Sequence, residues 1–202
     1  MINIDDSNYF KRTIKIFMIA IIIFLIAFVL SIIFSPSLET FKNTSNGISS
    51  KLSEAHGMNK VWLYILNNAI KVPFQMFVFS LIPIPFLYFL NIISTNVITG
   101  IVFAFAIHLN FNKGIIMVMS SIPHSVVETI AMCFVLSGLY KLNQSILRKV
   151  GNMFRKTKKK EISFKRALID LFKVYLFIAL PLYILAAFLE TYFTSFIYNI
   201  FT

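Results

Sequence analysis

The sequence predicts an all-α protein: a polytopic membrane helix bundle with about five transmembrane helices and a proline-broken second span. Three observations carry this prediction. Hydrophobic residues make up 58% of the 202 residues and charged residues only 13%, whereas soluble domains are near half apolar and about a quarter charged. Several apolar runs approach the roughly 20 residues needed to cross a hydrocarbon core. Most of the net positive charge lies in one segment between two of those runs.

That basic segment, residues 141–173, predicts the orientation. It contains eleven Lys or Arg and two acids, so it carries +9 of the net charge of +11. Short loops rich in Lys and Arg remain in the cytoplasm. We therefore expect residues 141–173 to form a cytoplasmic loop, with the N terminus inside and the C terminus outside.

The first span is predicted at about residues 14–34, an apolar run preceded by Arg12. Its length favours an uncleaved helix over a cleaved signal peptide, whose apolar region is about 7–15 residues long. Residues 35–71 are more polar and predict an extracytoplasmic loop. Trp62 and Tyr64 stand near the end of this loop, where amphipathic aromatics mark an interfacial helix that leads inward.

The second span is predicted at residues 72–93, which are apolar but contain Pro73, Pro83 and Pro85. Proline lacks the backbone donor that a helix interior needs, so we expect a kinked span or two half-helices that meet near residues 82–86. The short apolar segment 97–109 follows. The sequence leaves open whether 72–109 forms two full spans or a re-entrant pair, and both give the same orientation.

The fourth and last spans, residues 115–140 and 174–200, carry the ionisable residues of greatest interest. His124 and Glu128 are four residues apart and share one helix face. Counted at 1.5 Å per residue, His124 lies about 14 Å below the outer end of its span, and Glu190 about 12–15 Å below the outer end of the last span. Since the depths match, we expect His124, Glu128 and Glu190 to form one intramembrane polar cluster.

Three interpretations of this cluster compete. It is a buried network that fixes helix register, a path for a substrate, ion or proton, or a site of metal-dependent catalysis. His124 and Glu128 supply only two ligands, whereas a catalytic zinc takes three and an open position. The sequence contains no zinc-protease, nucleophile-elbow or phosphate-loop motif. We therefore expect a non-enzymatic protein without a cofactor, and keep a membrane metalloenzyme as the third alternative.

Small residues recur at every fourth position along the span predicted at residues 115–140, and they permit close approach by another helix. We expect this stripe to be a helix-packing surface. Its members are Ser121, Ser125, Thr129, Cys133 and Ser137.

The cations of the basic loop allow two interpretations of its function. Its cations attract anionic headgroups at about 1 kcal/mol per charge near the surface, or they dock an acidic partner. Residues 161–173 have apolar positions at helical spacing and predict an amphipathic helix at the membrane interface. Nucleic acid is not an expected partner, because no recognised binding module is present. The cations expected to contact lipid or partner are Arg155, Lys156, Lys158, Lys159, Lys160, Lys165 and Arg166.

Several stretches, in order along residues 60–202, resemble the stage II sporulation protein M family of bacterial integral membrane proteins. Residues 122–140 (IPHSVVETIAMCFVLSGLY) are similar to the family's Pro-His-Gly-x-x-Glu segment and its Gly-Leu helix end, although Ser125 stands where glycine is usual. The Ala-x-x-Glu stretch of the last helix has its counterpart at Glu190. The matching positions are Asn67, Asn68, Asn96, Gly100, Pro123, His124, Glu128, Gly138 and Glu190.

The resemblance implies a non-enzymatic component of an envelope assembly in the bacterial cytoplasmic membrane. The family's namesake recruits peptidoglycan-degrading enzymes at the engulfing membrane, and other members occur with genes for circular bacteriocins. We expect a scaffold for partner proteins, such as a cell-wall hydrolase or an ABC transporter. The alternative is a factor for maturation, export or immunity of an amphipathic bacteriocin. A homo-oligomer is left open.

Overall fold

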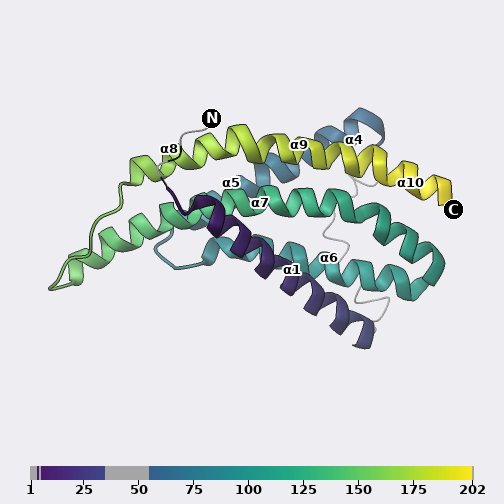
Figure 1. Ribbon diagram of the computed structural model, residues 1–202, viewed down its shortest axis with the longest axis horizontal. Helices are drawn as coiled ribbons and strands as arrows, with labels where there is room; N and C mark the ends of the chain where they lie inside the picture. Colours follow the sequence, from purple (N-terminus) through teal and green to yellow (C-terminus); the bar gives the residue numbers. More distant parts are fainter. Residues whose placement is uncertain (1–3, 5, 35–54, 202) are drawn as a thin grey trace.

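The structure is a computed structural model that describes residues 4, 6–34 and 55–201. All regular secondary structure in these ranges is helical, which agrees with the predicted all-α class. Figure 1 shows an elongated bundle whose helices run roughly along its long axis. Part of the predicted loop at 35–71 lies outside the described residues.

Four helical rods in the described ranges are long and apolar enough to cross a membrane. Many of their large apolar side chains are exposed, as expected where lipid is the solvent. The chain is therefore a membrane protein by length, composition and surface. The rods are Tyr9–Phe34, Leu87–Leu109, Phe111–Phe154 and Phe164–Tyr198.

The first rod, α1 (Tyr9–Phe34), packs against α6 (Leu90–Leu109). Gly100 is the point of closest approach: a Cβ there would lie 2.9 Å from the carbonyl oxygen of Phe24. Phe24 and Phe103 meet edge to face beside it. Gly100 is thus required for the contact between α1 and α6.

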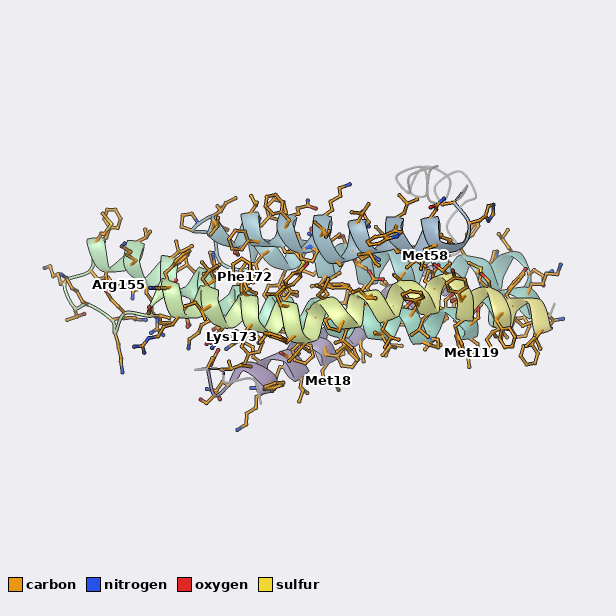
Figure 2. The ribbon with its side chains drawn as sticks, turned by 90° about the horizontal axis from the view of Figure 1, so that it is seen from above. Met18, Met58, Met119, Arg155, Phe172 and Lys173 are labelled. Carbon is orange, nitrogen blue, oxygen red and sulfur yellow. The ribbon has the colours of Figure 1, made fainter. Side chains whose placement is uncertain are left out.

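Helices α4 (Gly57–Tyr64), η1 (Ile65–Lys71) and α5 (Val72–Leu81) form one continuous rod. The backbone stays right-handed helical at both joints, Ile65 and Val72. The interfacial helix and the first half of the span predicted at 72–93 are therefore parts of a single helix. Figure 2 shows this rod lying along the bundle, with Met58 at one end of it.

The chain reverses direction after Leu81, and Pro83 and Pro85 lie in this turn instead of inside a span. A residue that precedes proline disfavours the helical region, so Ile82 is extended and ends the helix. A short 3-10 turn, η2 (Leu87–Phe89), then leads into α6. The boundaries predicted for the second and third spans, 72–93 and 97–109, therefore differ from the observed helices.

The longest element is α7 (Phe111–Phe154), with 44 residues. At 1.5 Å per residue it is about 66 Å long, more than twice the hydrocarbon core. Its N terminus is capped by Asn110, whose side chain accepts a hydrogen bond from the Lys113 amide at 3.1 Å. The span predicted at 115–140 marks only its apolar part, and the helix continues well beyond it.

The last rod begins with α8 (Phe164–Val174), whose buried face packs on α7. The amphipathic segment predicted to lie at the membrane interface thus forms a helical hairpin with the end of α7 (Figure 1). The rod continues without a break through the remaining elements. These are η3 (Tyr175–Ala179), α9 (Leu180–Phe188), η4 (Leu189–Phe193) and α10 (Thr194–Phe201).

The start of α1 is fastened to the middle of α7. The Arg12 guanidinium donates to the Ser137 carbonyl at 2.7 Å, and the Ser137 hydroxyl donates to the Tyr9 carbonyl at 2.8 Å. Arg12 also pairs with Asp6 at 2.7 Å. Burial raises the pKa of Asp6, but the hydrogen bond and charge of Arg12 and the charge of Lys141 outweigh it, so the pKa lies below its usual value.

Candidate functional site

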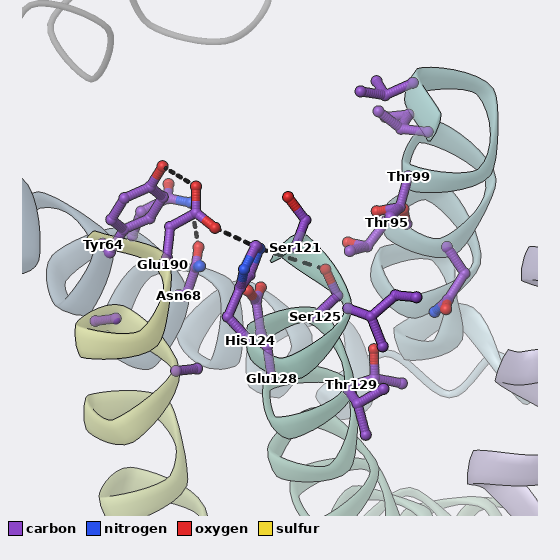
Figure 3. Close-up of a pocket in the computed structure, with 18 of the residues that line it drawn as sticks. Tyr64, Asn68, Thr95, Thr99, Ser121, His124, Ser125, Glu128, Thr129 and Glu190 are labelled. Carbon is purple, nitrogen blue, oxygen red and sulfur yellow. Dashed lines mark hydrogen bonds and ion pairs between the residues drawn. The ribbon is translucent and has the colours of Figure 1, made fainter. Parts of the chain in front are cut away.

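A cavity of about 830 Å³ lies between five parts of the bundle: α1, the α4–η1 rod, α6, α7 and the α9–η4 segment. Figure 3 shows α7 between Tyr64 and Asn68 on one side and Thr95 and Thr99 of α6 on the other. The cavity is unusual for a membrane bundle because so many polar side chains line it. They are Tyr64, Asn67, Asn68, Lys71, Thr95, Asn96, Thr99, Ser121, His124, Ser125, Glu128, Thr129 and Glu190.

The cavity occupies one half of the bundle only. Along α7 its lining runs from Met117 to Thr129. One turn further, Cys133, Leu136 and Ser137 are completely buried. The polar lining therefore ends on a packed layer.

The centre of the site is a contact between α7 and η4. His124 Nε2 lies 2.5 Å from Glu190 Oε2, and the Tyr64 hydroxyl donates to Glu190 Oε1 at 3.0 Å. His124 Nδ1 lies 3.2 Å from the Thr194 hydroxyl. Three rods are thus joined through one carboxylate and one imidazole.

Glu128 lies one turn along α7 from His124, on the same face (Figure 3). It interacts with the side chains of His124, Glu190 and Asn68. The structure therefore brings together the three ionisable residues that were expected to meet, and adds an asparagine from η1 to the cluster.

Two of the three rods that form the cluster are locally π-helical there. Asn67 and Asn68 lie in η1, and Glu190 lies in η4. A π-helical turn places more residues in each turn than an α-helix and is frequent at functional sites. The wider turns shift the register of both rods at the level of the cavity.

The stripe of small residues on α7 divides into two parts. Ser121, Ser125 and Thr129 line the cavity, whereas Cys133 and Ser137 are fully buried in helix contacts. The predicted packing surface is thus occupied by helices over its C-terminal part, and its N-terminal part borders the cavity.

The remaining motif positions have structural roles. Asn96 lines the cavity and donates to the Ile92 carbonyl of its own helix at 2.8 Å. Pro123 lies inside α7, where a proline cannot bond to the preceding turn. The nearby Ser120 carbonyl accepts from Thr194 at 3.2 Å. A Cβ at Gly138 would lie 2.6 Å from the Tyr9 hydroxyl.

Lys71 is a site residue that the sequence reasoning missed. It was assigned to the end of an extracytoplasmic loop, but it lies in the interior of the α4–α5 rod, lines the cavity and is exposed there. The signal was present in the sequence, since Lys71 directly precedes the apolar residues of α5. In the described ranges no ion pair includes Lys71.

The cations of the basic loop lie away from the cavity. Figure 2 shows Arg155 at the end of the molecule opposite to Met58 and Met119. Lys165 and Arg166 belong to the first turn of α8 and are exposed. The charged loop and the polar cavity are therefore two separate features.

Hydrogen bonds and one ion pair join the residues of the cluster. Ser125, His124 and Glu190 are adjacent, but the serine hydroxyl (3.3 Å) and the carboxylate both face the same nitrogen, Nε2. A catalytic triad places nucleophile and carboxylate on opposite nitrogens of the imidazole. No group of three metal-ligating side chains that could hold an ion occurs among the described residues.

Fold and site together define a multi-helix membrane protein with a polar cavity among its apolar helices. The chain belongs to the stage II sporulation protein M family, whose family profile matches residues 13–195. The match includes residues 13–34 of α1 as well as every cavity-lining residue. Among curated proteins and among solved structures, nothing matches the chain.

Proposed function

We propose that this protein is a non-catalytic, multi-pass component of an assembly in the bacterial cytoplasmic membrane. In this proposal the cavity holds a membrane segment of a partner protein. The N terminus and the basic hairpin face the cytoplasm, in keeping with the positive-inside rule. The cavity then lies in the outer half of the bilayer.

The proposal includes five crossings. The α4–η1–α5 rod has 25 helical residues, about 37 Å at 1.5 Å per residue, which is enough to cross a core of about 30 Å. Its polar residues face the cavity, which lowers its hydropathy below that of the four apolar rods. Five crossings also keep the two termini on opposite sides.

One observation carries the proposal: a polar cavity of about 830 Å³ at membrane depth. Polar groups in a bilayer need partners, and Lys71 brings a charge without an ion pair among the described residues. Two turns of a helix 10 Å across occupy roughly 850 Å³, so the cavity is large enough for a helical segment. Ser121, Ser125 and Thr129 would let that helix approach closely.

The shape of the site favours holding a partner over conducting a substrate. A path across the membrane would continue past Thr129, but the next turn of α7 enters the fully buried layer at Cys133 and Leu136. A cavity that is closed at one end by buried side chains supports a binding role. An acidic or amide-bearing partner helix would complement Lys71 and the asparagines.

Filling the cavity tests the proposal. Ser125→Leu adds a larger side chain to the cavity wall, whereas Met119→Leu changes an exposed residue of the same helix. After photocrosslinking from Thr95 in native membranes, we expect Ser125→Leu to lower the yield of partner adduct by about tenfold and Met119→Leu to leave it unchanged, since about 1.4 kcal/mol is a tenfold change. Equal yields in both variants would contradict the proposal.

A second candidate function has support from the mixed lining of the cavity. Phe17, Phe24 and Phe103 lie on one side of it and the polar cluster on the other. An amphipathic peptide matches such a lining, which fits a role in maturation, export or immunity of a circular bacteriocin. If His124→Ala/Glu128→Gln keeps full peptide production and resistance, the cavity is not the site of that role.

A further inference from the structure

The hairpin of α7 and α8 extends beyond the bundle at one end (Figure 1). In the orientation proposed above, on which this inference rests, the inner boundary of the membrane is taken at Tyr140, about one turn past the level at which Tyr9 and Arg12 bond to Phe134 and Ser137 of α7. The apolar part of α7 ends at Tyr140, and 14 further residues lead to Phe154. At 1.5 Å per residue they carry the tip about 21 Å past that boundary.

This length decides what the tip can reach. Headgroups add only about 5–8 Å on each side of the hydrocarbon core. A helix tilt of 40°, the top of the usual range, still leaves the tip about 16 Å from the boundary. The remaining gap is about one Debye length at physiological salt, roughly 8 Å. At the strongest tilt the end of α7 therefore stands about one Debye length from the headgroups, where their attraction is already substantially screened, and at smaller tilts it stands farther away.

The tip is held in a defined conformation. Asn152 is 7% exposed, and its side-chain amide donates to the Lys159 carbonyl at 2.9 Å while its oxygen accepts from the Lys159 amide at 2.9 Å. Arg148 donates to the Lys160 carbonyl at 3.0 Å. The turn that follows α7 is thus fastened to the helix by three hydrogen bonds.

The surface of the tip combines apolar side chains and cations. Met153 is 77% exposed and Phe154 85% exposed, although both lie outside the apolar part of α7. Five cations surround them, and in the described ranges none forms an ion pair. An exposed aromatic beside unpaired charge is typical of an interface that binds another protein. The five cations are Arg155, Lys156, Lys158, Lys159 and Lys160, all exposed.

We propose that the tip of the α7–α8 hairpin docks on a cytoplasmic protein with an acidic rim around an apolar pocket. Phe154 enters the pocket, and the lysines pair with the rim. Charge complementarity selects an acidic surface, and the length of α7 selects a soluble partner over lipid. The inference is independent of the partner proposed for the cavity, because the two features lie at different levels of α7.

The first arm of the test asks whether the tip contacts lipid. Thr157→Cys can be labelled selectively with a fluorophore, because Cys133 is the only cysteine and is buried. The labelled full-length protein is placed in vesicles of neutral lipid or of one-third anionic lipid, each carrying a headgroup quencher. We expect the same weak quenching in both. Stronger quenching in anionic vesicles would overturn the proposal in favour of lipid binding.

The second arm identifies the partner in growing cells. A photocrosslinking residue at Phe154 is expected to give an adduct with a soluble cytoplasmic protein, identified by mass spectrometry, whose surface has an acidic patch. Lys158→Glu should lower the adduct yield by about fivefold, and a Glu→Lys change in that patch should restore it, since like charges across an interface repel.

The matched control is Lys149→Glu, the same charge reversal on an exposed residue of the hairpin stem. Its adduct yield should remain within about twofold of wild type. Adducts with integral membrane proteins alone, or yields that fall equally in Lys158→Glu and Lys149→Glu, would overturn the proposal. Adduct formation from Thr95 in the cavity should not change in either variant, which keeps this test separate from that of the cavity.

Discussion

In the proposed orientation, the outer and inner halves of the bundle use α7 in opposite ways. In the inner half, Ser137 and Gly138 are buried against α1 and α8, and polar groups are satisfied by neighbouring backbone. In the outer half, Ser125 and Thr129 continue the same small-residue spacing but border an open polar cavity. The same spacing of small residues thus forms a buried helix contact in one half and part of the cavity wall in the other. The two halves differ in whether neighbouring helices cover these residues.

The largest effect expected from this difference is at Gly138. A Cβ there would lie 2.6 Å from the Tyr9 hydroxyl and 2.7 Å from Leu171 Cδ1. Gly138→Val should therefore lower the free energy of unfolding by about 3 kcal/mol, the upper range for overpacking. Thermal unfolding in detergent measures it. Ser125→Val, which adds bulk toward the cavity, should change stability by less than about 0.5 kcal/mol; equal losses would mean that the two halves are packed alike.

The contact between His124 and Glu190 should have the next largest effect. Glu190→Ala leaves His124 and the Tyr64 hydroxyl without their partner, at 2.5 and 3.0 Å respectively. A lost buried partner costs about 1–3 kcal/mol, so we expect a loss of about 2 kcal/mol by the same unfolding measurement. A double-mutant cycle with His124→Ala should give a coupling energy above about 0.5 kcal/mol. Strict additivity would show that the pair contributes nothing to the outer half.

Replacing Lys71 should raise the stability of the protein, whereas the two preceding replacements lower it. Lys71 lines the cavity and forms no ion pair among the described residues, so Lys71→Met removes a charge that costs free energy at membrane depth. We expect a gain in stability of about 1 kcal/mol together with a weaker partner crosslink from Thr95. Lys149→Met, at an exposed position of α7 away from the cavity, is the control for net charge. A loss of stability in Lys71→Met would mean that the outer half is complete without a partner.

The sequence predicted how deep along their helices the polar residues lie, but it could not predict which of them face a cavity. Because an α-helix rises uniformly, counting residues from the outer ends placed His124 and Glu190 at one level, and they do meet. Hydropathy could not identify the rod at 57–81 as one helix, because Asn67 and Asn68 face a cavity instead of lipid. The local π-helical turns at these asparagines depend on packing between rods, which no periodicity of a single segment records.

Two further features of the structure could not be predicted from the sequence for the same reason. Apolar length marked 115–140 as a span but could not reveal that α7 continues to Phe154, since a helix outside the membrane needs no apolar run. The amphipathic pattern of 161–173 correctly predicted a helix with one apolar face. It could not distinguish a lipid surface from α7 as the partner of that face, and the structure places Ala167 and Leu171 against α7.

The smallest expected effect is at the inner end, in the contact between Asp6 and Arg12. Burial raises the pKa of Asp6, but Arg12 and Lys141 lower it more strongly, so the carboxylate contributes stability above its unfolded pKa of about 4 and loses it as the pH falls through the lowered value. Asp6→Asn should therefore cost about 0.5 kcal/mol at pH 7, as expected for a partly solvated pair. The difference between variant and wild type should disappear as the pH falls below about 4. Urea or thermal unfolding at both pH values measures it, with Glu161→Gln, at an exposed position, as the charge-matched control. A difference that stays constant to pH 3 would show that the side-chain shape of Asp6, and not its charge, holds α1 to α7.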